Sequence, residues 1–142
     1  MPAINFKTTL TTLLIGVAAA GCGGPSDQEQ VRNLIGDYLT AFSKNDGAKV
    51  CSLLTANAQR DVQKGAGLIR GKDCAETMTT LSKISSEAAP GLLKLFHAGK
   101  VVVDGNEAGV IIQPAAPGTK PTKLVKVDGK WLIDGSVSIS RK

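Results

Sequence analysis

The sequence has few aromatic residues, no block of like charge and a single histidine. One Trp, one Tyr and three Phe make up 4% of the 142 residues, and basic and acidic residues are interspersed. Proteins that bind single-stranded nucleic acid combine a basic groove with aromatic side chains on which bases stack. The formal net charge of +5 therefore does not indicate a nucleic-acid partner, and we expect none.

Sequence motifs for metal, phosphate or nucleophile chemistry are also missing. The three cysteines form no Cys-x-x-Cys pair, and His97 alone cannot complete a zinc site with them. The chain has no Gly-x-Ser-x-Gly, no phosphate-binding glycine-rich loop and no His-Glu-x-x-His. We therefore predict no metal and no cofactor, and we assign no catalytic residue.

The uncharged run near the N-terminus is shorter than the roughly 20 apolar residues that a membrane-spanning helix needs. It follows Lys7, covers residues 8–20, and ends in small residues before Cys22. This order is typical of a secretory signal peptide, which we predict over residues 1–21. Residues 22–26 would form a short spacer. Residues 27–142 are long enough for one domain with a buried core.

The stretch Ala19-Ala20-Gly21-Cys22 resembles the lipobox of bacterial lipoproteins. Small side chains immediately before the cysteine let an extended backbone pass through a peptidase. The resemblance implies that diacylglycerol is attached to the Cys22 thiol and that cleavage falls before this residue. The domain would then sit at the outer face of the cytoplasmic membrane, bound to it through the lipid. The alternative is an ordinary secretory signal with an incidental cysteine.

The remaining two cysteines are expected to pair with each other. An odd number of cysteines in an exported protein needs an explanation, and lipid on Cys22 supplies one. Two leftover thiols outside the cytoplasm usually form a disulfide. We therefore predict a disulfide between Cys51 and Cys74.

The first half of the chain has helical patterns. Ser26 with Glu29 three residues later matches a capping box. The apolar stripe that follows is Val31, Leu34, Ile35, Tyr38, Leu39 and Phe42. The sequence 44–47 ends this helix. Further helices are expected over about 48–54, from a cap at Thr55 to about 62, from Asp73 to about 84, and as one turn over 92–96.

The second half has the patterns of strands in two hairpins. Apolar runs at 101–103 and 110–112 flank a turn at 104–107. Strands over 123–127 and 130–139 flank Asp128-Gly129, a strong hairpin signal. Alternation in the last strand gives one buried face; its members are Trp131, Ile133, Val137 and Ile139. Helices followed by strands predict an α+β fold, with helices packed on an antiparallel sheet of about four strands.

This order resembles the nuclear transport factor 2-like superfamily, also called cystatin-like cones, and particularly its small exported lipoproteins from actinobacteria. The resemblance is carried by the long first helix, by residues 48–55, by Asp73-Cys74 and by residues 125–134. It implies a bent antiparallel sheet wrapped around helices, often with an apolar cavity at the open end. Members of the superfamily include isomerases, dehydratases, binding modules and proteins of unknown role, so the fold alone selects no function.

We expect an apolar pocket inside this cone. The few aromatic side chains leave space between a bent sheet and its helices. The candidate lining is Tyr38, Leu39, Phe42, Trp131, Ile133 and Val137. No carboxylate is expected inside, because Asp37, Asp46 and Asp134 lie on polar faces or turns of the predicted elements. Tyr38 is expected in the core with its hydroxyl at the rim.

Three functions fit these features. The first is a membrane-tethered lipoprotein that binds an apolar small ligand or an envelope protein without catalysis. The second is an enzyme of the steroid-isomerase or dehydratase type, with its site in the cone. The third is a structural accessory subunit of an envelope complex, with a filled core. A dry apolar cavity favours the first, a titratable group facing an open cavity the second, and a solid core the third.

Overall fold

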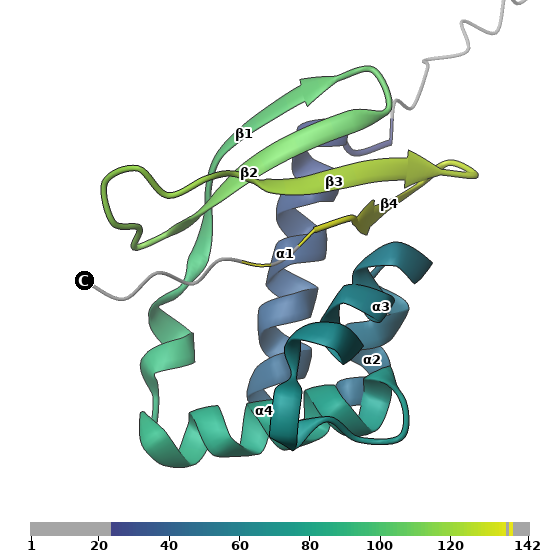
Figure 1. Cartoon of the computed structure of the whole chain (residues 1–142). Helices are drawn as coiled ribbons and strands as arrows, with labels where there is room; N and C mark the ends of the chain where they lie inside the picture. Colours follow the sequence, from purple (N-terminus) through teal and green to yellow (C-terminus); the bar gives the residue numbers. More distant parts are fainter. Residues whose placement is uncertain (1–23, 136, 138–142) are drawn as a thin grey trace, which may run out of the picture.

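The computed structural model describes residues 24–135 and 137, so the predicted signal peptide and Cys22 lie outside the described residues. The elements are α1 (Asp27–Ser43), α2 (Gly47–Ser52), α3 (Ala56–Gly65), η1 (Gly67–Ile69), α4 (Cys74–Ala88), η2 (Leu92–Leu95), β1 (His97–Asp104), β2 (Glu107–Gln113), β3 (Thr122–Val127) and β4 (Lys130–Ile133). The α+β class and the antiparallel sheet are confirmed, and the four described strands follow the order β1-β2-β3-β4. Figure 1 shows the sheet at one end, α2, α3 and α4 gathered at the other, and α1 spanning both.

Local signals in the sequence set the bounds of α1. The Ser26 hydroxyl accepts a hydrogen bond from the backbone N–H of Glu29 at 3.2 Å, as the capping box predicts. The helix ends where Asn45 adopts a positive φ of 57°, a left-handed conformation that asparagine tolerates. The apolar stripe between these ends faces the core, with Val31 and Ile35 fully buried. This helix is therefore the one that both the sheet and the other helices pack against.

The two predicted hairpins are present. At the second, Val127 pairs with Lys130 around Asp128 and Gly129, whose φ angles are 49° and 77°. Positive φ at both turn positions matches the right-handed twist of the flanking strands and favours this dipeptide. In the first hairpin, the register between β1 and β2 shifts between Ala98 and Val101. Val101, Val110 and Ile112 point into the core from this hairpin.

The last strand is shorter than predicted. We expected it to run to Ile139, but β4 ends at Ile133, and Asp134 and Gly135 are irregular. The N–H of Asp134 still donates to the carbonyl oxygen of Lys123 at 2.9 Å, but the residue pairs between β3 and β4 end at Leu124 and Ile133. Ile139 lies outside the described residues.

Two other boundaries differ from prediction. Helix α4 continues to Ala88, beyond the expected end near residue 84. It stops only when Ala89, which precedes Pro90, becomes extended at φ −146°. His97, which lies between the predicted helical turn 92–96 and the predicted strand at 101–103, is the first residue of β1, and its side chain is exposed.

The disulfide joins the short helix α2 to the start of α4. Cys51 and Cys74 are bonded with their Cα atoms 6.1 Å apart, which confirms the predicted pair. Gly47 lies on the same interface, where its backbone N–H donates to the Thr79 hydroxyl at 3.2 Å. The absence of a side chain at Gly47 lets the two helix backbones approach closely.

A backbone connection ties the helices to the sheet. The N–H of Ile133 donates to Leu53, and the N–H of Thr55 donates to Ile133, both at 2.9 Å. The Thr55 hydroxyl caps α3 and donates to the Asp134 carboxylate at 2.7 Å. Asp134 was expected on the exposed strand face, but it is half-buried. The Thr55 hydroxyl gives its carboxylate a hydrogen-bond partner there. The connection holds α3 beside the residues that follow β4.

Candidate functional site

The first hollow is an apolar cavity of about 280 Å³, which we call the Tyr38 pocket. It lies between α1, α3, η1, α4 and the segment after β4. Its lining is Tyr38, Leu54, Ala58, Asp61, Val62, Gly65, Ala66, Ile69, Leu81, Gly135 and Val137. Aliphatic carbon dominates this lining, and among the described residues Tyr38 and Asp61 are its only polar side chains. A concave, mostly apolar cavity with few polar groups is the usual form of a small-molecule site.

Tyr38 closes the pocket from the α1 side. Its side chain is 7% exposed, and its ring stacks on Phe42 with the centroids 6.2 Å apart. Burial raises the pKa of Tyr38 to about 12, because the charged phenolate is poorly solvated there. The phenol is therefore protonated at neutral pH and can donate a hydrogen bond. Within the described residues, no partner is bonded to its hydroxyl.

Two residues of α3 determine how the pocket meets solvent. Asp61 is exposed and supplies the only carboxylate of the lining within residues 24–135 and 137. Gly65, at the end of α3, leaves open space, because a Cβ added there would meet no atom within 4 Å. The pocket thus combines a buried phenol, an exposed carboxylate and an unfilled position at its edge.

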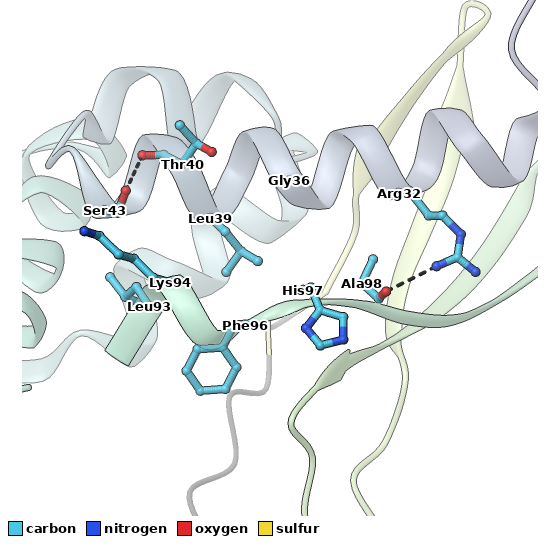
Figure 2. Close-up of a pocket in the computed structure, with 10 residues that line it drawn as sticks. All are labelled: Arg32, Gly36, Leu39, Thr40, Ser43, Leu93, Lys94, Phe96, His97 and Ala98. Carbon is cyan, nitrogen blue, oxygen red and sulfur yellow. Dashed lines mark hydrogen bonds between the residues drawn. The ribbon is translucent and has the colours of Figure 1, made fainter. Parts of the chain in front are cut away.

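The second hollow is a more open cleft of about 470 Å³ between α1 and the start of β1, which we call the α1–β1 groove. Its lining is Arg32, Gly36, Leu39, Thr40, Ser43, Leu93, Lys94, Phe96, His97 and Ala98. Figure 2 shows Arg32 and Lys94 near opposite ends, with His97 between them. Leu39 and Phe96 are buried and supply apolar surface, whereas the basic side chains are exposed.

Arg32 is held against the first residues of β1. Its Nη1 donates to the carbonyl oxygens of Ala98 at 3.2 Å and Gly99 at 2.8 Å. These bonds connect α1 to the irregular part of β1, where the strand register shifts. They also orient the guanidinium, whose remaining N–H groups have no protein acceptor among the described residues.

A third polar cluster joins the start of α1 to the second hairpin. The Asp27 carboxylate accepts from Lys126 Nζ at 2.7 Å and from Trp131 Nε1 at 3.0 Å. Lys126 also lies 5.6 Å from the centre of the Trp131 ring. The hydrogen bond from Lys126 and, next, that from Trp131 hold the pKa of Asp27 below its ordinary value. This cluster is structural, because it ties α1 to β3 and β4.

The six residues predicted to line one pocket are divided among three environments. Tyr38 and Val137 line the Tyr38 pocket, and Leu39 lines the α1–β1 groove. Trp131 and Ile133 are buried in the core, and Phe42 is half-buried against it. Asp37 and Asp46 are exposed, as expected. The sheet face therefore packs on α1 at Trp131 and Ile133, and the cavity opens nearer to α3.

Most of the lining of the Tyr38 pocket was missed from the sequence. Ala58, Val62, Ile69 and Leu81 were not among the predicted pocket residues, although all four line it. The spacing of Ala58 and Val62 by four residues was the available signal, since it places both on one face of α3.

No protein-family model matches this chain, and no curated protein is significantly similar to it. Among the described residues, no helix is both long and apolar enough to cross a bilayer, and no three potential metal-ligating side chains cluster together.

Proposed function

We propose that this protein is an exported lipoprotein that binds an apolar small molecule in the Tyr38 pocket and does not catalyse a reaction. The observation that carries the binding role is the cavity of about 280 Å³ with its aliphatic lining. Each CH₂ group transferred from water to such a surface contributes roughly 0.8 kcal/mol. A ligand with several such groups gains enough binding free energy for selective retention.

The proposed anchor is diacylglycerol on Cys22, which holds the domain at the outer face of the cytoplasmic membrane. Its support is the leader 1–21 and the small residues before Cys22. The Cys51–Cys74 disulfide agrees with an oxidising compartment outside the cytoplasm. Because α1 begins at Asp27, five residues after Cys22, the domain would remain close to the bilayer.

We also propose that the fold belongs to the nuclear transport factor 2-like superfamily. Three features support this assignment: helices precede strands, α1 packs along the sheet, and the four described strands form a simple antiparallel meander. In that fold, the Tyr38 pocket would correspond to the open end of the cone. The superfamily contains both binding modules and enzymes, so the choice between them rests on the lining of the pocket.

The lining favours binding over catalysis. A general base must lie within hydrogen-bond reach of the proton that it removes and must have a pKa suited to the working pH. The protonated Tyr38 phenol is a donor and not a base, since its pKa is about 12. Asp61, the carboxylate among the described lining residues, is exposed to water and not enclosed in the cavity. The pocket is therefore suited to hold a ligand and to accept or donate one orienting hydrogen bond.

The test compares a substitution at the edge of the Tyr38 pocket with a matched substitution in the α1–β1 groove. Gly65→Leu places a side chain into open space at the edge of the Tyr38 pocket, and Gly36→Leu does the same in the α1–β1 groove. The probe is N-phenyl-1-naphthylamine, a neutral molecule whose fluorescence increases in apolar sites. We expect Gly65→Leu to weaken its binding at least ten-fold, since displacing about two CH₂ contacts costs roughly 1.6 kcal/mol.

The control variant Gly36→Leu is expected to bind this probe as the unaltered protein does. Equal binding by both leucine variants, or no binding by the unaltered protein, would contradict the proposed pocket. Turnover of a ketosteroid that disappears in Tyr38→Phe would instead establish the enzymatic alternative.

A further inference from the structure

We propose that the α1–β1 groove is a second, independent binding site, and that it takes a small organic anion with an apolar body, such as a carboxylate or phosphate with an alkyl chain. The groove shares no lining residue with the Tyr38 pocket. Its occupancy therefore does not depend on the function proposed for that pocket.

The charge of the groove favours an anion. Arg32 and Lys94 both line it, and none of the described lining residues is Asp or Glu. The ion pairs among the described residues are Lys123 with Glu107 and Lys126 with Asp27, so neither groove cation has a carboxylate partner there. Two cations beside one cleft without a protein counter-ion produce a positive potential, which attracts an anionic ligand.

The orientation of Arg32 prepares it for this role. The two bonds from Nη1 to the carbonyls of Ala98 and Gly99 fix the guanidinium at one end of the groove. Nη2 and Nε remain as donors, and a guanidinium edge matches the geometry of a carboxylate or phosphate. Because the backbone already holds the side chain, little rotamer freedom is lost when a ligand binds.

The remaining lining indicates an apolar body for the ligand. Leu39 and Phe96 form a buried apolar floor, and Leu93 and Ala98 extend it. Gly36 keeps the α1 side open, since a Cβ there would meet nothing within 4 Å. From Arg32 to Ser43 the helix advances about 16 Å at 1.5 Å per residue, which gives room for an extended alkyl chain. A fully polar anion would leave this floor uncovered.

The test compares four probes that share one alkyl chain: octanoate, octyl phosphate, 1-octanol and octyltrimethylammonium. Binding is measured by isothermal titration and by NMR shifts of Ala98 and Gly99, which report the groove directly. We expect the two anions to bind about ten-fold or more tightly than octanol, and the cation to bind least. The preference for anions should fall when the salt concentration is raised, since the groove cations are exposed.

The variants separate charge from shape. Arg32→Gln should weaken octanoate binding about ten-fold or more, because a charged hydrogen-bond donor is lost. The Lys94 side chain makes no hydrogen bond within the described residues. Lys94→Gln should therefore weaken octanoate binding about two- to five-fold without disturbing the fold. The matched control is Lys49→Gln, an exposed cation on α2 outside the groove, which should change nothing.

Gly36→Leu should block the groove for all four probes, whereas Gly65→Leu should leave octanoate binding in place. Octanol binding as tightly as octanoate would overturn the proposal, as would an equal effect of Lys49→Gln and Lys94→Gln. If Gly65→Leu abolished octanoate binding and Gly36→Leu did not, the anion would bind in the Tyr38 pocket, and the proposal would also be overturned. Failure of the neutral probe in the Tyr38 pocket leaves these outcomes unchanged.

Discussion

Replacing Gly47 with alanine is expected to lower the free energy of unfolding by about 3 kcal/mol or more. A Cβ at this position would lie 2.0 Å from the carbonyl oxygen of Ala75 and 2.6 Å from the backbone nitrogen of Thr79. Both are backbone atoms of α4, so no side-chain rotation can relieve the overlap. The two helices would have to separate, and the hydrogen bond from Gly47 to the Thr79 hydroxyl would be lost.

The matched control is Gly36→Ala, in the middle of α1. There the added Cβ meets nothing within 4 Å, and alanine costs less conformational entropy than glycine in a helix. We expect this variant to be more stable by about 0.5–1 kcal/mol. Urea denaturation of both variants measures the difference. A Gly47→Ala protein as stable as the unaltered one would show that α2 and α4 are not packed as described.

Removing the Cys51–Cys74 disulfide is expected to cost about 3 kcal/mol of stability. The two cysteines are 23 residues apart in the chain, so the bond restricts a sizeable loop of the unfolded protein. The loop contains η1, whose Leu68 is fully exposed and which buries little to hold itself in place. The double variant Cys51→Ala, Cys74→Ala should therefore unfold at a lower urea concentration.

Reduction of the unaltered protein is the control, since it breaks the bond and leaves both side chains in place. We expect reduction and the double variant to lower stability by similar amounts, and to loosen α3 and η1 before the sheet. Free thiols in the unreduced protein, or identical midpoints with and without reductant, would contradict the described disulfide.

The parts of the fold that follow from short-range chemistry were predictable. Ser26, Thr55 and Asp73 all cap helices at the positions that their sequence context indicates. Asp128-Gly129 forms the predicted turn, because positive φ at two successive positions is accessible to this dipeptide. The disulfide was predictable because only two thiols remained after assignment of Cys22.

The interactions that bring distant segments together were not predictable in the same way. An acidic residue in the first turn, such as Asp27, is favourable to the helix dipole, but nothing local indicates that it binds Lys126, 99 residues away. The carbonyl oxygens that accept from Arg32, those of Ala98 and Gly99, likewise follow from how α1 crosses β1. No local pattern specifies which helix face meets which strand.

The candidate pocket was predicted in kind but not in position. The scarcity of aromatic side chains indicated unfilled space, and the structure has a cavity beside Tyr38. Its walls come from four helical segments and from Gly135 and Val137, because β4 stops at Ile133 and frees the chain to turn toward α3.

The claim that places this domain on a membrane is tested most directly by the intact mass of the mature protein, extracted with detergent from membranes of a bacterium that expresses the full chain. Our account predicts a chain that begins at Cys22 and carries diacylglycerol on its thiol. It further predicts that Cys22→Ala accumulates as an uncleaved precursor beginning at Met1. A mature protein without lipid, or one that begins at any other residue, would contradict the account.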